Sequence, residues 1–397
     1  MSRSIKHVAV ILPDEPGYSN RVRRGMGLYA LKTECWTFEF MWGFEEAAET
    51  LKRHKPDGII VDPRWYQWIS RLNRLDVPLV TVTKVPGEPE ANYVGVDEPA
   101  VGRMAAGYFR KSGYTNLGFC GYPNNFYSEG REEGFRDELA GTGVKLQLFK
   151  ELFDTNEQAY QGELKLRQWI DTLSKPVAIF ACHDALALRL LQICRYANIR
   201  VPYDVAILGV DNREDLCEFS HPPLSSIDTG PERIGYEAAV LLDKLIHSES
   251  APSSPVLIPP LEVVTRQSTD VMAVYDEIMI ESLQFIRDNA ARPIGVEDIL
   301  RVVPAGRRKL ERLFRKTLGR SPLSEIRRQH VERAKRLLSQ TDMSMYEIAK
   351  ACGFPHGPHM AKVFRSETGM TPTQYRKQFF LLRSKHSGIR TIEQENS

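Results

Sequence analysis

The sequence predicts two domains of different fold class: an α/β domain with parallel sheets in two lobes over residues 1–271, followed by an all-α domain with two helix-turn-helix motifs over residues 276–385. Three observations lead to this prediction. Apolar runs alternate with helical stretches through the first part of the chain, which is typical of parallel sheets covered by helices on both faces. A small helical unit occurs twice near the C-terminus. The net charge also changes sign between the two regions.

The strands of the α/β region are expected from its short apolar runs. The first five read HVAVILP, WTFEFM, DGIIVD, VPLVTVT and NYVGVD, with helices over residues 18–31, 45–53, 65–75 and 98–112. The next four read NLGFCGYP, VKLQLF, PVAIFACHD and DVAILGVDN, with helices over residues 128–139, 157–173 and 185–197, before a surface loop and the strand VLIPPLEVV. A region of about 270 residues is too long for one hydrophobic core, so we expect two α/β lobes.

Polar residues follow several of these strands, at the edge where parallel sheets bind ligands. They include Asp62, followed by Trp65 and Tyr66, and later the pairs His183-Asp184 and Asp211-Asn212. Carboxylates accept hydrogen bonds from hydroxyls, and aromatic rings cover C–H faces, so the combination suits a polyhydroxylated ligand. Each aspartate could equally cap the helix that follows it.

The C-terminal repeat has landmarks fifty residues apart. Leu310, Phe314, Gly319 and Pro322 recur as Met360, Phe364, Gly369 and Pro372. In the first copy we expect helices over residues 296–303 and 307–318. In the second, Ser344 and Glu347 form a capping box, Cys352–Phe354 supplies the turn, and a helix covers residues 356–368. An apolar stripe from Ile326 to Leu338 predicts a helix that joins the copies.

The charge distribution fits nucleic-acid binding by this region. Residues 281–397 carry 23 Lys and Arg against 12 Asp and Glu, whereas residues 1–280 carry 30 against 39. A basic module of this kind can replace the counterions of DNA phosphates. Charge alone would also fit ordinary solvated helix faces.

The residues expected to contact bases lie on the exposed N-terminal part of each second helix, because that part enters the major groove in helix-turn-helix proteins. They are Arg307, Arg308, Glu311 and Arg312 in the first copy, and His356, His359 and Lys362 in the second. Leu310, Leu313 and Phe314, with Met360, Val363 and Phe364, are expected to face the core of their own unit.

Residues 276–383 resemble the DNA-binding domain of AraC-type transcription regulators, and YEIAKACGFPHGPHMAKVFRSETGMTPTQYRK matches the signature of that family almost end to end. The first copy departs from the pattern at two positions. Gly306 stands where the family usually has a Ser N-cap, and Pro304 stands where it usually has Gly. Glycine still caps, so the helix should form with slightly less support.

Residues 177–246 resemble the sugar-binding core of LacI/GalR regulators and periplasmic sugar-binding proteins, so the resemblance implies a two-lobed periplasmic-binding-protein-like domain. The sugar site of that family lies at positions held here by His183, Asp184 and Asp211, and by Arg131 of REEGF. The DNA-binding headpiece that normally precedes such a domain is not expected here, because residues 4–13 already read as the first strand. The DNA-binding module is expected at the other end.

This combination resembles bacterial sugar-operon regulators along the chain. The resemblance implies a pentose-responsive transcriptional activator with D-xylose as the expected effector, which works as a homodimer on operator sites of double-stranded DNA together with RNA polymerase. A regulator that senses another sugar or small molecule, or that represses, remains open. An enzyme is not expected, because the chain carries no phosphate-binding, dinucleotide-binding or nucleophile-elbow motif.

The expected location is the cytoplasm, because the N-terminus has no sustained apolar stretch and no segment approaches the roughly 18 apolar residues that span a bilayer. The six cysteines show no C-x-x-C and no zinc spacing with His, so reduced thiols are expected. No cofactor and no metal ion are predicted.

Overall fold

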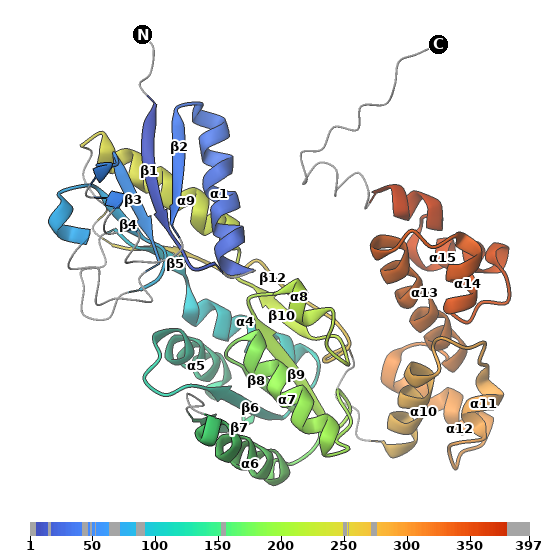
Figure 1. Cartoon of the computed structure of the whole chain (residues 1–397). Helices are drawn as coiled ribbons and strands as arrows, with labels where there is room; N and C mark the ends of the chain where they lie inside the picture. The colour runs from blue at the N-terminus through green and yellow to red at the C-terminus, as the bar shows by residue number, and fades with distance from the viewer. Residues whose placement is uncertain are drawn as a thin grey trace, which may run out of the picture. The chain divides into compact units, whose positions relative to one another are not determined.

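The computed structural model describes residues 5–14, 17–41, 47, 50–51, 53–62, 72–84, 92–151, 156–248, 252, 254–270 and 276–378. The chain divides into two compact units, Met1–Ala273 and Val274–Ser397 (Figure 1). Most of the helix expected over residues 65–75, including Trp65 and Tyr66, lies outside the described residues, and only a short 3-10 helix, η2 (Asn73–Leu75), is seen there. Much of the helix expected over 45–53 lies outside them too.

The first sheet of the N-terminal unit is parallel and has the order β2-β1-β3-β4. Its strands are β1 (Lys6–Ile11), β2 (Trp36–Met41), β3 (Gly58–Val61) and β4 (Leu79–Thr81). Two further strands, β5 (Val94–Val96) and β11 (Val256–Ile258), pair in parallel beside β4. The helices α1 (Tyr18–Thr33) and α9 (Pro231–Ile246) pack closely, because a Cβ atom on Gly25 would meet the carbonyl oxygen of Glu232 at 1.9 Å.

The second sheet has six strands in the order β12-β10-β9-β8-β6-β7. They are β6 (Asn116–Gly121), β7 (Lys145–Lys150), β8 (Val177–Ala181), β9 (Val205–Val210), β10 (Ser225–Asp228) and β12 (Glu262–Val264). Its helices are α4 (Glu98–Lys111), α5 (Phe126–Leu139), α6 (Asn156–Thr172), α7 (Asp184–Tyr196) and α8 (Glu214–Cys217). The buried strands and alternating helices confirm the predicted α/β class, although β12 runs antiparallel to β10.

The prediction of a single strand for VLIPPLEVV is wrong. The segment forms two strands in two different sheets, β11 beside β5 and β12 beside β10. Pro259 and Pro260 separate them because proline has no N–H to donate to a strand ladder. The chain therefore passes between the sheets at this point, as it also does from β5 to α4 and from β10 to α9.

The C-terminal unit is helical throughout its described elements. They are α10 (Glu277–Asp288), α11 (Val296–Leu300), α12 (Arg307–Leu318), α13 (Pro322–Gln340), α14 (Met345–Ala351) and α15 (Gly357–Thr368). The bounds of α12 agree with the prediction, and α15 begins one residue later than predicted because His356 is its N-cap. The first helix of the first copy, α11, ends at Leu300 and is shorter than expected.

The repeat in sequence is also a repeat in structure. Phe314 and Phe364 are both fully buried, and Gly319 and Gly369 end their helices in the left-handed region with φ of 67° and 77°. The capping box of Ser344 and Glu347 is formed at the start of α14. From α13, the joining helix, Val331, Ala334 and Leu338 pack into the core of the second copy. Two helix-turn-helix units on one joining helix are therefore present.

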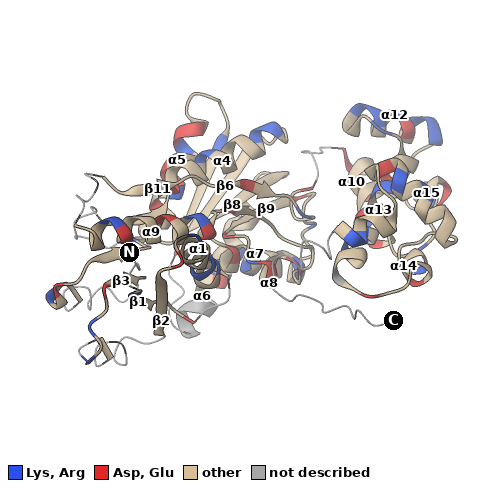
Figure 2. Ribbon diagram, turned by 90° about the horizontal axis from the view of Figure 1, so that it is seen from above, with Lys and Arg blue, Asp and Glu red and all other residues tan. Residues whose placement is uncertain are grey.

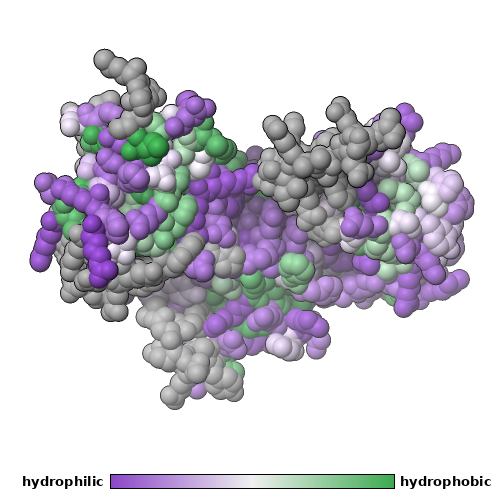
Figure 3. All heavy atoms as spheres, turned by 45° about the horizontal axis from the view of Figure 1, so that its top comes forward, coloured by the Kyte–Doolittle hydropathy of each residue, from purple (hydrophilic) through white to green (hydrophobic). Residues whose placement is uncertain are grey.

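The surface in Figure 3 is mostly hydrophilic, with smaller hydrophobic patches. Among the helices that the structure describes, none is both long and apolar enough to cross a membrane. All six cysteines are free, and five of them are buried.

Candidate functional site

Arg131 and Asp211, two of the predicted ligand residues, lie together. Arg131 comes from α5 and is 4% exposed, and its Nη2 lies 3.6 Å from Oδ1 of Asp211. Its Nε donates to Glu98 at 2.6 Å, and its Nη1 donates to the carbonyl oxygen of Cys182 at the end of β8. The arginine is therefore held on three sides, while the side chain of Asp211 remains 27% exposed.

Asp211 follows β9 in an unusual backbone conformation. Its φ is 99°, and that of Asn212 is 47°, both in the positive region that side chains other than glycine rarely adopt. The N–H of Asp211 donates to the carbonyl of Ile227, and the N–H of Asn212 donates to Oγ of Ser226 at 2.9 Å. Strain of this kind persists only where surrounding contacts fix it, and it concentrates at functional sites.

His183 is the N-cap of α7, and its ring joins the same cluster. Its Nδ1 accepts from the N–H of Leu186 at 3.1 Å, and burial lowers its pKa to about 4. The neutral ring therefore carries its proton on Nε2 and can donate one hydrogen bond. The ring centroid lies 5.3 Å from that of Tyr122 and 6.2 Å from that of Tyr127.

Sequence reasoning missed three residues of this cluster: Glu98, Tyr122 and Tyr127. The ring of Tyr127 lies 5.2 Å from the guanidinium carbon of Arg131, within the range of a cation–π contact. Tyr127 stands one helical turn before Arg131, so the spacing alone could have suggested it. Glu98 lies far from Arg131 in sequence, and its contact depends on how α4 and α5 pack.

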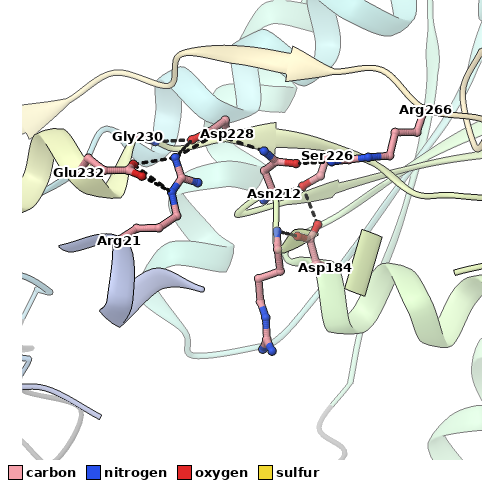
Figure 4. A network of polar contacts seen from close by, with 9 residues as sticks. Arg21, Asp184, Asn212, Ser226, Asp228, Gly230, Glu232 and Arg266 are labelled. Carbon is pink, nitrogen blue, oxygen red and sulfur yellow. Dashed lines mark hydrogen bonds and ion pairs between the residues drawn. The ribbon is translucent and has the colours of Figure 1, made fainter. Parts of the chain in front are cut away.

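Asp184 is placed differently from the other predicted residues. It is 1% exposed, and its oxygens accept from Oγ of Ser226 at 2.6 Å and from the N–H of Arg213 at 2.8 Å (Figure 4). The thiol of Cys217 lies 3.4 Å from the same carboxylate. Burial, with Asp211 nearby, raises the pKa of Asp184 to about 7. This geometry favours a role in holding residues 211–213, and a direct ligand contact by Asp184 stays a prediction.

Asn212 connects this loop to two other parts of the N-terminal unit. Its Nδ2 donates to Asp228 at 3.2 Å, and its Oδ1 accepts from Nη2 of Arg266 at 2.9 Å (Figure 4). Asp228 also accepts from Nη2 of Arg21 in α1 at 2.9 Å. Arg266 belongs to the segment between β12 and the end of this unit. The loop next to Asp211 is therefore tied both to α1 and to the segment that leads to the C-terminal unit.

In the first helix-turn-helix unit, the predicted contact residues divide into two pairs. Arg307 lies 2.6 Å from Glu297 and 3.4 Å from Glu311, so its charge is balanced locally. Arg308 and Arg312 are exposed and one turn apart on α12. Figure 2 shows the concentration of Lys and Arg on this helix. All three arginines are exposed, and what sets Arg307 apart is its two ion pairs.

In the second unit, His356 caps α15 by accepting the N–H of His359 on its Nδ1 at 3.2 Å. His356 and Lys362 are exposed, and His359 is half-buried with its ring 6.1 Å from that of Phe354. All three lie on the cap or the first two turns of α15, the part expected to enter a groove.

Comparisons with known proteins agree with both halves of this description. Residues 106–269 match a family described as a periplasmic binding protein-like domain, and residues 300–378 match a helix-turn-helix domain. The chain is 29% identical to the xylose operon regulatory protein of Haemophilus influenzae over 95% of this chain and 99% of that protein. The protein of the same name from Escherichia coli K12 is also 29% identical, over 93% of this chain and 96% of that protein.

Solved structures give the same result. The structure of a xylose-binding transcription activator, xylR, is similar with a TM-score of 0.79 and 28% identity, and covers 95% of this chain and 99% of that one. A transcriptional regulator CelR in complex with cellobiose shares the fold of the N-terminal unit, with a TM-score of 0.55 and 21% identity over 67% of this chain and 85% of that one.

Proposed function

We propose that the chain, a transcription regulator that shares its full two-domain organisation with the xylose operon regulatory proteins, is a D-xylose-dependent transcriptional activator. The observation that carries the proposal is the match to those regulators over 95% of this chain, with both domains in the same order. We assign residues 1–271 to effector binding and residues 276–385 to DNA binding. The protein is expected to act in the cytoplasm as a homodimer that contacts RNA polymerase.

The cluster around Asp211 supports a sugar as the effector. The partly exposed carboxylate of Asp211 can accept from two hydroxyls, and Nε2–H of His183 can donate to a third. Arg131 supplies further donors, and the rings of Tyr122 and Tyr127 are of the kind that cover the C–H face of a sugar. Asp184 holds the loop that carries Asp211. The relative with cellobiose shows that the fold itself does not fix which sugar is bound.

The DNA-binding surface is proposed from the two second helices. The helix α12 would enter one segment of the major groove with Arg308 and Arg312, and with Arg307 and Glu311 beside them. The helix α15 would enter the next segment with His356, His359 and Lys362. Arginine pairs with guanine more often than any other combination of side chain and base. The effector can shift the N-terminal unit between two conformations only if it binds one of them more tightly than the other. This difference in effector affinity limits how much effector binding can change the affinity of the protein for DNA.

Selection of binding sites from a pool of random duplexes, with and without D-xylose, tests the proposal. We expect a recurring sequence that contains two half-sites, one for the pair of recognition helices of each protomer. Binding to this sequence should be tighter when D-xylose is present. Equal binding with and without D-xylose, or a response only to another compound, would contradict the assigned effector. Recovery of no sequence at all would contradict DNA binding. Unchanged D-xylose after incubation with the protein is the expected result of an assay for enzymatic turnover.

A further inference from the structure

We propose that Glu98 is a positioning residue of the effector site, which holds Arg131 by its Nε edge so that the Nη2 edge faces Asp211 and the bound sugar. The proposal rests on the function inferred above, in which Arg131 and Asp211 contact the effector. Glu98 is 9% exposed and lies in the first turn of α4, and its carboxylate is 2.6 Å from Nε of Arg131. The cation it meets is itself only 4% exposed.

The packing of α4 against α5 is built to make this contact. A Cβ atom on Gly134 would meet the carbonyl oxygen of Pro99 at 1.9 Å, and one on Gly102 would meet that of Arg131 at 2.1 Å. A Cβ atom on Gly130 would meet Cβ of Glu98 at 2.8 Å. The three glycines thus allow the two backbones to approach closely, which brings the first turn of α4 within reach of the guanidinium on α5.

The place of Glu98 in the chain adds a second consequence. Asp97, the N-cap of α4, directly follows β5, which pairs with β11, and its N–H donates to the carbonyl of Ile258 at the end of β11. Two of the three connections between the sheets, from β5 to α4 and from β11 to β12, meet here. Glu98 therefore links the effector arginine to the point where the two sheets are joined.

Without the Glu98 carboxylate, the guanidinium of Arg131 would have Asp211 as its remaining anionic partner among the residues that the structure describes. A stronger pair between Arg131 and Asp211 would occupy the oxygens that are proposed to accept sugar hydroxyls. The charges facing Glu98 are Arg131 from α5, Asp211 from the loop after β9, and Asp97 on its own helix, which pairs with Arg103 at 3.8 Å. Glu98 must be ionised to compete for the guanidinium.

Burial raises the pKa of Glu98 to about 7, against the opposing effect of Arg131. Because only the ionised form holds Nε, affinity for the sugar should rise with pH. The ionised fraction of Glu98 increases between pH 6 and pH 8, so we expect the affinity for D-xylose to rise over this interval. His183, with a pKa of about 4, stays neutral throughout.

The test is calorimetric titration of the full-length protein with D-xylose at pH 6, 7 and 8. Glu98→Gln should bind about tenfold more weakly than the wild type at pH 8 and should lose the dependence on pH. Glu132→Gln is the matched control, because Glu132 is equally buried on α5 but pairs with Arg136 at 2.8 Å and Lys150 at 3.0 Å; it should bind like the wild type. Asp184→Asn should retain the pH dependence, which separates Glu98 from the other carboxylate with a pKa of about 7.

Glu98→Asp keeps the charge on a shorter side chain, so weaker binding with the pH dependence retained is expected. This variant also decides the matter if Glu98→Gln does not fold. Two results would overturn the positioning role. One is that Glu98→Gln binds D-xylose with the affinity and pH dependence of the wild type. The other is that Glu98→Asp loses the pH dependence. A wild-type protein that does not bind D-xylose would instead contradict the proposed function on which the inference rests.

Discussion

Replacement of Arg266 by lysine should weaken the coupling between effector and DNA while leaving the effector site intact. Nη2 of Arg266 donates to Oδ1 of Asn212 at 2.9 Å, and Nη1 donates to the carbonyl of Leu224 at 3.0 Å. Lysine keeps the positive charge and the backbone N–H, but a single ammonium group does not reproduce the planar fork of the guanidinium. The contact with the residue next to Asp211 is then lost or weakened.

The magnitude follows from the bonds involved. A hydrogen bond to a charged group contributes about 1.5–3 kcal/mol, and loss of one such bond sets an upper limit to the change in coupling free energy. Since about 1.4 kcal/mol is a factor of ten, we expect the D-xylose-induced gain in DNA affinity to shrink by about tenfold. Affinity for D-xylose in the absence of DNA should change far less, because Arg131 and Asp211 keep their contacts.

Fluorescence anisotropy with a selected DNA site, with and without saturating D-xylose, measures the gain directly. Arg200→Lys is the matched control: Arg200 also makes a two-pronged contact in the same unit, with Asp204 at 2.7 and 2.9 Å, but that contact does not involve the loop at Asp211. If Arg266→Lys responds to D-xylose like the wild type, or if the control loses the response equally, the connection through Asn212 does not carry the coupling.

Three further predictions concern other parts of the chain. Phe364→Ala should destabilise the C-terminal unit by about 3–5 kcal/mol, because the ring is fully buried; chemical denaturation measures this, and a loss below about 1 kcal/mol would contradict the packing described. Gly134→Ala should weaken D-xylose binding in calorimetry by forcing α4 from α5, whereas Gly107→Ala, whose Cβ meets nothing within 4 Å, should not; equal affinities would argue against close helix packing as the cause. Arg312→Ala should weaken binding to the selected DNA site by about 1–3 kcal/mol and relax the sequence preference at one base pair, as expected for one lost base contact, and an unchanged sequence preference would remove Arg312 from the residues that contact bases.

Much of the fold could be predicted because local signals agreed with tertiary structure. The second helix of the first unit has both predicted ends, Arg307 and Leu318, since Gly306 and Gly319 stop it on either side. In VLIPPLEVV, Pro259 and Pro260 indicate that the strand is interrupted. The apolar residues on both sides of the prolines nevertheless favoured the prediction of one strand. Which sheet each half joins depends on distant partners.

The candidate site was predicted less completely, for two physical reasons. His183 and Asp184 are neighbours in sequence, yet the histidine ring joins the aromatic cluster while the aspartate lies 2.6 Å from Ser226. The direction of adjacent side chains at a strand end cannot be obtained from sequence spacing. Glu98 meets Arg131 across 33 residues only because glycines allow the two helices to approach closely, and an isolated glutamate in a helix gives no sign of this.

The most direct test of the account is the change in melting temperature of the full-length protein on addition of D-xylose, in the wild type and in Asp211→Ala. A ligand that binds only the native state raises the melting temperature in proportion to RT ln(1 + [L]/Kd). We predict a clear rise in the wild type and none in Asp211→Ala. A rise with another compound and none with D-xylose, or an equal rise in both proteins, would contradict the assignment of effector and site.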